Sequence, residues 1–235
     1  MAELSQETKR LLAQTSTATL ATQLFKRGLR NTFLLGVSRL NRDPGPVMVG
    51  EAYTLRYIPA REDLNGPGEY DDRHPQRRAI EECPPGAVLV ADCRRDASAA
   101  CGGDILMTRL ASRGVGGMVT DGGMRDVANI AKLAMPVYIG APAAPASFHR
   151  HAAVDANVPI GCGGVPVYPG DVVVGDLDGV VVIPRHLAAE IATDAAEQER
   201  LEAWILDEVR GGKGIFGLYP PDERTRARYE ASRRG

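Results

Sequence analysis

The sequence predicts an α/β fold, and three observations support it. Between residues 76 and 139, strand-like apolar runs alternate with segments that have a helical pattern. Glycine and proline mark most of the joins between these segments. The composition is that of an ordinary globular chain, with 44% hydrophobic and 25% charged residues in a length of 235. A β-α-β-α-β rhythm of this kind is typical of a sheet covered by helices.

The first part of the chain predicts helix, then strand, then loop. Apolar residues at helical spacing predict a helix over residues 4–28, which ends at a glycine. A threonine- and serine-rich patch over 15–22 interrupts it and is a candidate cap between two helices. Residues 47–57 are rich in β-forming side chains and predict a strand. Residues 59–78 are polar, with many charges, glycines and prolines, and predict a loop that is either functional or a solvated insertion.

The rest of the chain predicts alternating elements and a last long helix. We expect helices at 76–83, 103–113 and about 125–133, and strands at 87–91, 114–120 and 137–139. Residues 165–171 predict a strand followed by a turn. Residues 172–183 predict two strands that join at Asp178-Gly179, a strong hairpin signal. A helix over 186–210 ends at Gly211-Gly212. The apolar stretch at 215–221 is a candidate for docking on a neighbouring subunit.

Charge and cysteine content narrow the class of protein. The formal net charge of −2 gives no strong field that would attract nucleic acid or an anionic membrane. The amino-terminal residues are polar, and no run approaches the roughly 20 apolar residues that span a bilayer. None of the four cysteines forms a C-x-x-C pair, so we expect reduced structural thiols. We therefore expect a cytoplasmic protein that binds neither nucleic acid nor membrane.

A glycine-rich junction carries the most chemical information. The segment Asp121-Gly-Gly-Met-Arg125-Asp126 joins a predicted strand to a predicted helix, where ligands gather in open α/β sheets. Arg125 offers a planar fork for a carboxylate or enolate oxygen. Asp126, in the first helical turn, suits a metal ion. The alternative is structural: Asp126 caps the helix and Arg125 pairs with a surface acid.

A second candidate anion site lies upstream. Gly102-Gly103-Asp104 leads into a predicted helix, whose first N–H groups have no partner within the helix. The amides of Ile105 and Leu106 would bind a substrate carboxylate there. The alternative is a helix N-cap by Asp104. His149 and His151 resemble a metal-binding pair, but their position in a proline-rich stretch favours two solvent-exposed side chains.

Taken in order, these motifs resemble the RraA-like / 4-hydroxy-4-methyl-2-oxoglutarate aldolase family. The resemblance covers about residues 15–212 and includes further matches at 50–56, 85–90, 159–171 and 175–184. It implies a three-layer β/β/α sandwich of the swivelling-domain type. It also implies that residues 1–235 form a single domain with helical extensions at both ends, and that homotrimers or homohexamers place the sites between subunits. The tail at 213–235 would then dock on a neighbouring subunit.

The resemblance also implies an activity and a role for each site residue. The activity is that of a divalent-metal-dependent class II pyruvate aldolase, which cleaves a 4-hydroxy-2-oxo acid to pyruvate and a carbonyl product and decarboxylates oxaloacetate as a side reaction. By position, Asp126 would hold the metal, most often Mg²⁺, with Mn²⁺ as an alternative. Arg125 would bind the substrate and stabilise the enolate, while Asp104 would orient Arg125 and a water molecule. The Gly103–Leu106 turn would hold the substrate carboxylate.

Other parts of the resemblance leave alternatives open. A neighbouring subunit would contribute a glutamate, with Glu202 the best match and Glu199 the alternative. The family also contains a regulator that binds and inhibits ribonuclease E, so a non-catalytic role is the second hypothesis. Retention of Asp104, Arg125 and Asp126 together favours the enzyme. A Schiff-base route would need a desolvated lysine, and of the lysines only Lys132 lies near the motif, in a position that predicts exposure.

The sequence departs from the family in two places. Thr22-Gln23-Leu24 stands where many members have Asp-Ala-Leu, and both the 59–78 loop and the tail after Gly212 are longer than in compact members. These differences leave the substrate open.

Overall fold

The computed structural model describes residues 4–41, 45–66 and 71–233. Within these residues, eight strands form one mixed sheet in the order β1-β6-β4-β3-β2-β9-β10, with β8 paired to β2. The strand bounds are β1 Ser38–Arg39, β2 Met48–Pro59, β3 Val88–Asp92, β4 Gly117–Thr120, β6 Val137–Ile139, β8 His151–Ala156, β9 Val172–Gly175 and β10 Val180–Ile183. The short strands β5 (Gly123–Met124) and β7 (Ala141–Pro142) pair separately in parallel.

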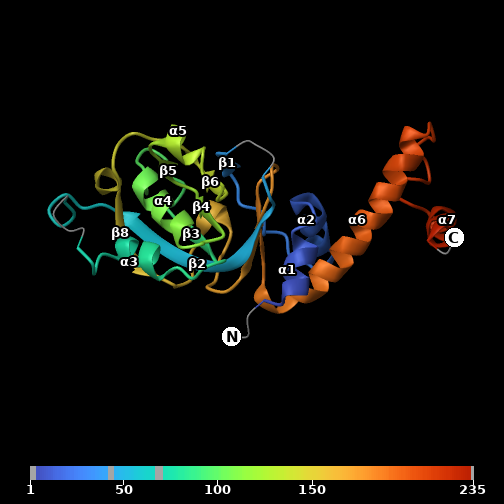
Figure 1. The fold of residues 1–235 in the computed structure, drawn as a ribbon, viewed down its shortest axis with the longest axis horizontal. Coiled ribbons are helices and arrows are strands. Elements are labelled where there is room, and N and C mark those ends of the chain that lie inside the picture. Colours follow the sequence, from blue (N-terminus) through green and yellow to red (C-terminus); the bar gives the residue numbers. More distant parts are fainter. Residues whose placement is uncertain (1–3, 42–44, 67–70, 234–235) are drawn as a thin grey trace.

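Helices cover this sheet on two sides (Figure 1). Three of them, α3, α4 and α5, lie beside the parallel strands, while α1, α2 and α6 lie beside β9 and β10. The helix bounds are α1 Gln6–Leu12, α2 Thr17–Lys26, α3 Pro75–Glu82, α4 Asp104–Ser112, α5 Val127–Ile130, α6 Ala188–Arg210 and α7 Glu223–Ser232, with 3-10 turns η2 Ser147–His149, η3 Cys162–Gly164 and η4 Arg185–Leu187.

The long strand β2 connects the two parts of the sheet. Its first residues, Met48–Glu51, pair antiparallel with β9. Its later residues pair parallel with β3 on one side and antiparallel with β8 on the other. Because β3, β4 and β6 run parallel to β2, their carboxyl ends lie at one edge of the sheet. The candidate site lies at this edge.

The core consists of three layers of apolar side chains. Along β3, Leu89 and Ala91 pack with the layer that faces α3 and α4, while Val88 and Val90 pack with the opposite layer, because successive strand side chains point to opposite faces. A third layer lies between the β9–β10 hairpin and α1, α2 and α6. A strand that is apolar on both faces, as β3 is, indicates a central position in the sheet.

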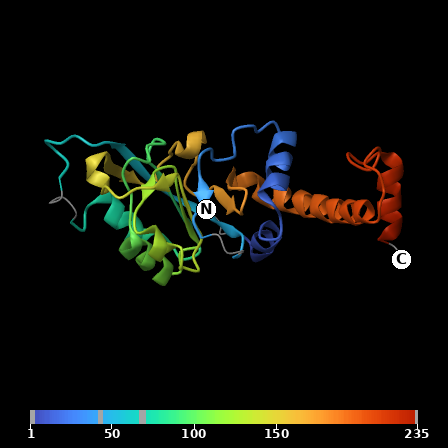
Figure 2. The same cartoon turned by 90° about the horizontal axis from the view of Figure 1, so that it is seen from above.

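Helix α6 extends away from the body of the molecule (Figures 1 and 2). Its 23 residues correspond to about 34 Å. Its first turns are buried through Ala188, Ile191 and Ala195. Helix α7 packs near its far end, where the rings of Trp204 and Tyr229 are 5.8 Å apart.

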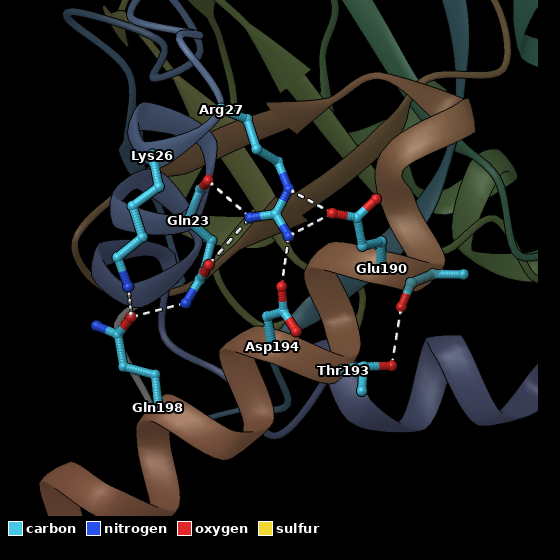
Figure 3. A network of polar contacts seen from close by, with 8 residues as sticks. Gln23, Lys26, Arg27, Glu190, Thr193, Asp194 and Gln198 are labelled. Atoms are coloured by element: carbon cyan, nitrogen blue, oxygen red, sulfur yellow. Dashed lines mark hydrogen bonds and ion pairs between the residues drawn. The ribbon is translucent and has the colours of Figure 1, made fainter. Parts of the chain in front are cut away.

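Polar contacts fix α2 on the first half of α6 (Figure 3). Arg27, at the end of α2, donates hydrogen bonds to Glu190 and Asp194 of α6 and to the carbonyl of Gln23. The Gln23 side chain in turn donates to Gln198 at 2.8 Å. These contacts add geometric specificity to the apolar packing of the two helices.

The structure confirms the α/β class and most predicted elements. The segment at 4–28 forms two helices, and Ser16 caps the second by accepting from the amide of Thr19 at 3.1 Å. Loop 59–78 is shorter than predicted, because Pro59 ends β2 and Pro75 begins α3; its residues 67–70 lie outside the described part. No helix in the described residues is both long and apolar enough to cross a membrane.

Two predictions about elements were wrong, and β8 and α7 were not predicted. Residues 165–171 do not form a strand: Pro166 has no N–H to donate, and only an isolated bridge joins Val167 to Ile160. Strand β8 was missed, because His151–Ala156 is poor in β-forming residues and is paired by the edge of β2. Helix α5 is four residues long instead of about nine. Helix α7 was missed because it is almost entirely polar.

Candidate active site

The carboxylate of Asp121, the first residue of the motif, is buried at the end of β4. It accepts backbone hydrogen bonds from Cys93 at 2.7 Å, Arg95 at 3.0 Å and Gly163 at 3.0 Å. Burial raises the pKa of Asp121, and the hydrogen bonds from Gly163 and Cys93 oppose this effect. The residue therefore ties the loop after β3 and the η3 turn to the end of β4 and has a structural role.

Gly103 brings Arg125 and Asp126 together. A Cβ atom at this position would lie 2.6 Å from Oδ2 of Asp126 and 3.1 Å from Nε of Arg125. The Arg125 amide donates to the carbonyl of Gly102 at 3.1 Å, and its Nε lies 3.3 Å from Oδ2 of Asp126. The backbone of Gly103 is extended, with φ −142°, so its lack of a side chain matters for close approach and not for conformation.

Asp126 differs from the prediction. It precedes α5 instead of lying in its first turn, with φ 57° and ψ 32°, and its side chain makes no capping hydrogen bond. A non-glycine residue in this left-handed conformation costs about 1–3 kcal/mol, and such residues cluster at functional sites. Asp126 thus occupies the N-cap position that the structural alternative gave it, but its carboxylate does not cap the helix. The side chain of Asp126 is 40% exposed and that of Arg125 is 49% exposed, so both can reach a ligand.

The start of α4 lies against this pair. Gly103 is the N-cap, and Asp104 is the first helical residue, so the alternative N-cap by Asp104 is wrong. The carbonyl of Gly103 accepts the first hydrogen bond of the helix, from the amide of Met107 at 3.1 Å. The amides of Ile105 and Leu106 come before Met107, so they have no partner within the helix and point out of its amino end. Asp104 accepts a hydrogen bond from Asn129 of the α5 segment at 2.8 Å.

Two hollows meet at Arg125. A cleft of about 210 Å³ is lined by Gln76, Arg77, Ala100, Gly102, Gly103, Arg125, Ala146, Ser147 and Phe148. A second hollow of about 420 Å³ is lined by Met124, Arg125, Asp126, Val127, Pro142, Ala143 and Ala144. Sequence reasoning missed the contributions of α3 and η2 to the first cleft. No local pattern marks them, because packing alone carries these segments to the ends of β3 and β4.

The donor set near Gly103 suits a hard, hydrated cation. In the described residues, no group of three or more His, Cys, Asp or Glu side chains could hold a metal ion. The carboxylates of Asp104 and Asp126 lie beside the same short turn. Mg²⁺ usually keeps several waters and takes one or two carboxylates, whereas a structural zinc site needs four protein ligands. These two residues therefore fit Mg²⁺ or Mn²⁺ and not a closed zinc site.

The two histidines do not form a metal pair. His149 is exposed, as predicted, but His151 is buried in β8 with 2% of its surface exposed, which is contrary to the prediction. Burial and then the nearby Arg94 lower the pKa of His151. Its Nδ1 lies 3.3 Å from Nη2 of Arg94.

The two candidate glutamates, Glu199 and Glu202, differ in their hydrogen-bond partners. Glu199 accepts hydrogen bonds from the amide and hydroxyl of Ser16 at 2.9 and 2.8 Å, so it supports the start of α2. Glu202 accepts from Gln198 at 2.9 Å and lines a cavity of about 550 Å³. Helix α6 and the α4–α5 region lie on opposite sides of the sheet (Figure 1). Within one chain, therefore, neither glutamate joins Arg125.

Two carboxylates in the segments that resemble the family are structural, and Lys132 is exposed. Asp176 accepts from the amide and hydroxyl of Thr17 and fixes α2 on the hairpin. Asp171 accepts from the amides of Tyr168 and Arg185. Lys132 is exposed, so its amine is not desolvated as a Schiff-base lysine needs to be.

Comparison with known proteins shows the family. The model of the RraA-like family, described as Aldolase/RraA, matches residues 17–182. A protein of Halalkalibacterium halodurans named as a candidate 4-hydroxy-4-methyl-2-oxoglutarate aldolase is 37% identical over 136 residues, which cover 56% of this chain and 64% of that protein. The chain thus spans less than two thirds of the length of this curated relative.

Two solved structures share the fold over most of the chain. An uncharacterised protein from Pseudomonas syringae pv. tomato has a TM-score of 0.79 and 25% identity, covering 93% of this chain and 100% of that one. RraAS2 of Streptomyces coelicolor, titled an unusual member of the RNase ES inhibitor RraA protein family, has a TM-score of 0.76 and 32% identity, covering 87% and 98%. Since the family model covers well over half of the sequence, the chain belongs to the RraA-like (Aldolase/RraA) family.

Proposed function

We propose that this protein is a divalent-metal-dependent lyase that cleaves a 4-hydroxy-2-oxo acid to pyruvate and a carbonyl product. The observation that carries the proposal is the close packing of Arg125 and Asp126 over Gly103, beside the open amino end of α4. This packing places a guanidinium group, a carboxylate and free amides around one small space. The aldolase name of the relative from Halalkalibacterium halodurans supports the same chemistry.

In this proposal, different groups of the chain bind the substrate carboxylate, stabilise the enolate and supply a proton. The amides of Ile105 and Leu106 bind the carboxylate of the pyruvyl group, since helix amino ends favour anions. The Arg125 guanidinium donates to the oxygen on which negative charge collects as the C3–C4 bond breaks, and this stabilises the pyruvate enolate. Asp104 holds a water molecule that returns a proton to the enolate carbon. Oxaloacetate would give the same enolate on loss of CO₂, so we expect decarboxylation as a side activity.

Asp126 would hold the cation, with Asp104 nearby and water completing the shell. The bound cation supplies Lewis acidity toward the 2-oxo oxygen of the substrate. We propose Mg²⁺ as the usual ion and Mn²⁺ as a substitute, because both accept oxygen ligands and retain water.

A base for the 4-hydroxyl proton is supplied by a neighbouring subunit in this proposal. Of the two candidate glutamates, Glu202 is favoured, because Glu199 is already engaged by Ser16. The carboxylate of Glu202 takes the hydroxyl proton, directly or through water.

This arrangement requires a homotrimer or homohexamer, with the three-layer β/β/α sandwich of the family as its protomer. It also leaves the exposed Phe216 of the 213–235 tail available for subunit docking. The four buried free thiols fit a reducing, cytoplasmic compartment.

Pyruvate release tests the proposal. The purified protein is assayed with oxaloacetate and with several 4-hydroxy-2-oxo acids, in Mg²⁺, Mn²⁺ or EDTA. We expect turnover with either metal, its loss in EDTA, and a fall of about 10²–10³-fold in kcat for Arg125→Ala, the usual effect of removing a donor to a developing oxyanion. Asp126→Asn is expected to weaken Mn²⁺ binding in calorimetry.

Arg109→Ala is the matched control for the arginine variant. Arg109 lies on α4 and pairs with Glu81 at the surface, so the same charge is removed without touching the cleft. Metal-independent turnover, or an Arg125→Ala variant as active as Arg109→Ala, would overturn the lyase proposal.

A second candidate function is regulation of a ribonuclease. It is favoured by the similarity to RraAS2, whose title places it in a family of RNase ES inhibitors. A protein that lacks lyase activity but inhibits ribonuclease E in a cleavage assay would support this role. Retained inhibition by Arg125→Ala would place the regulatory surface away from the cleft.

A further inference from the structure

The buried amide of Gln76 presents an oxygen atom to the cleft beside Arg125. Gln76 lies in the first turn of α3, is 4% exposed and lines the 210 Å³ cleft. Its Nε2 donates to the carbonyl of Cys101 at 2.5 Å. Since only the nitrogen of the amide can donate to a carbonyl, this hydrogen bond also fixes the position of the amide oxygen, Oε1.

Oε1 of Gln76 is available to a ligand. Within residues 4–41, 45–66 and 71–233, no hydrogen bond to this oxygen is present, and the oxygen is not among the buried polar atoms that lack a partner. It therefore faces open space, and the cleft is the space that Gln76 lines. The amide cannot turn its oxygen away from the cleft without breaking the hydrogen bond to Cys101.

A second hydrogen bond supports the same carbonyl from another element. The hydroxyl of Tyr57, in β2, donates to the carbonyl of Cys101 at 3.2 Å. Cys101 directly precedes Gly102-Gly103, so Gln76 and Tyr57 both attach their elements to the turn that carries the site. Tyr57 is not among the residues that line the cleft, and this difference separates support of the turn from contact with a ligand.

The groups around Oε1 restrict the ligand to a neutral donor. The Arg125 guanidinium has only N–H groups to offer, and among the described residues that line the cleft none is acidic. Arg125 would repel an ammonium group, and the partial negative charge of Oε1 would repel a carboxylate. A hydroxyl group is the neutral donor that suits this oxygen. The amide has no basic oxygen that could take the proton, so its contribution is to binding.

The position of Asp126 indicates which part of a substrate reaches Gln76. Asp126 lines the neighbouring hollow and not the cleft. A pyruvyl group held between Asp126, Arg125 and the α4 amides would therefore leave the rest of the substrate to extend past Arg125 into the cleft.

We infer that Gln76 binds a hydroxyl group on the fragment released as the carbonyl product, so that the substrate class is a 4-hydroxy-2-oxo acid with a further hydroxyl beyond C4. The inference rests on the proposed lyase function for its catalytic meaning. The recognition of the hydroxyl group by Oε1 does not require cleavage and can be measured without it.

The first experiment measures binding without cleavage. 5-Hydroxy-2-oxopentanoate and 2-oxopentanoate differ only in the terminal hydroxyl, and neither has a 4-hydroxyl group. We expect calorimetry in Mg²⁺ to show that Gln76→Leu weakens binding of the hydroxylated acid about three-fold to about ten-fold, the range for a neutral hydrogen bond, and leaves binding of 2-oxopentanoate unchanged. Each comparison is made between proteins with the same ligand, so any cyclic form of the hydroxy acid cancels.

Two further variants accompany Gln76→Leu. Gln76→Met removes the same oxygen with a flexible side chain, and it gives the same result if contact with the ligand is the cause. Tyr57→Phe is the matched control, because it removes the other hydrogen bond to the Cys101 carbonyl and leaves Oε1 in place. We expect Tyr57→Phe to affect the two ligands equally.

The second experiment measures turnover with the matching substrates. 4,5-Dihydroxy-2-oxopentanoate gives pyruvate and glycolaldehyde, and 4-hydroxy-2-oxopentanoate gives pyruvate and acetaldehyde. We expect Gln76→Leu to lower kcat/KM for the dihydroxy acid by the same factor as in binding, mainly through KM. Cleavage of 4-hydroxy-2-oxopentanoate should keep its rate, since it has no hydroxyl beyond C4.

The outcomes separate the two proposals. If Gln76→Leu and Gln76→Met weaken both non-cleavable ligands equally, or weaken neither, the role of Gln76 is overturned even if the protein is a lyase. A loss confined to the hydroxylated ligand that also occurs in Tyr57→Phe overturns it as well, since a displaced turn would then explain the effect. A selective loss in the Gln76 variants alone, with no turnover of either substrate, supports the hydroxyl site and refutes the lyase function.

Discussion

At the scale of single residues, close approach to Gly103 decides the geometry of the site. Asp126 and Arg125 both reach within about 3 Å of the position that a side chain at residue 103 would occupy. The same turn leaves the α4 amides open, because a glycine N-cap brings no oxygen to cover them. The absence of a side chain at residue 103 therefore makes room for the Arg125–Asp126 ion pair and also leaves the α4 amides open to an anion.

Replacement of Gly103 by alanine tests this role. The extended backbone of residue 103 accepts alanine, so we expect the fold to be kept and the melting temperature to change little. The new methyl group would displace Asp126 and Arg125, and a shift of about 1 Å at a site can cost about 10²-fold in kcat/KM. Gly102→Ala is the control, since the nearest atoms to its methyl group would be those of the flexible side chains of Met107, Met124 and Leu106. Full activity in Gly103→Ala would show that the close approach is not needed.

At the scale of elements, α7 is held to α6 by contacts that sequence periodicity did not predict. Glu197 of α6 accepts hydrogen bonds from Arg200, from the hydroxyl of Tyr229 and from Arg233. Arg228 lies over the ring of Trp204 at 5.1 Å. A polar helix such as α7 is stable here because its partner supplies the aromatic and charged contacts.

Acid is expected to loosen α7. The hydrogen bond from Arg200 lowers the pKa of Glu197 below its ordinary 4.5. A lowered folded-state pKa means that the stabilisation is present above the unfolded value and is lost as the pH falls through the folded value. Trp204 is the one tryptophan of the chain and packs against Tyr229, so its emission should shift to the red as the pH is lowered below 4.5.

Glu197→Gln provides the control for this titration. The variant lacks the titrating group, so the red shift should already be present in part at neutral pH and the acid transition should be smaller. Identical titrations of the wild type and Glu197→Gln would exclude Glu197 as the group responsible.

At the scale of the whole molecule, the projecting α6 separates the two halves of the proposed site. Arg125 and Asp126 lie at the carboxyl edge of the parallel strands, while Glu202 lies on the extended helix on the other side of the sheet (Figure 1). A site that needs both groups requires a second copy of the chain. The 550 Å³ cavity beside Glu202 is a candidate for the place where that copy meets the helix.

Mixing two inactive variants tests a shared site. Arg125→Ala and Glu202→Gln are each expected to be inactive alone. After co-refolding in equal amounts, about one quarter of the interfaces would combine an intact Arg125 with an intact Glu202, and about one quarter of the wild-type activity should return. Glu199→Gln serves for comparison: it should keep activity but lose stability at the start of α2, where Ser16 is its partner. No recovery on mixing would contradict a site shared in this way.

The sequence by itself determined the local elements and the candidate residues. The apolar runs predicted β3, β4, β6, β9 and β10, and the Asp178-Gly179 turn predicted the hairpin of β9 and β10. These predictions succeeded because the spacing of apolar residues and the choice of turn residues are local properties of the sequence. The motif also identified Arg125 and Asp126 before any contact was known. Strand β8 and helix α7 were missed, since their residues form these elements only against β2 and α6.

Only the tertiary structure decided which residues share a space. It showed that Asp121, the first residue of the motif, is buried and supports two segments, the loop after β3 and the η3 turn. It joined Gln76 and Arg77 of α3 to Arg125 across one cleft. It also showed that Glu199 of α6 accepts hydrogen bonds from Ser16 at the start of α2. The physical reason is that strand pairing and side-chain packing bring together groups far apart in the sequence, and no periodicity in a single chain encodes those distances.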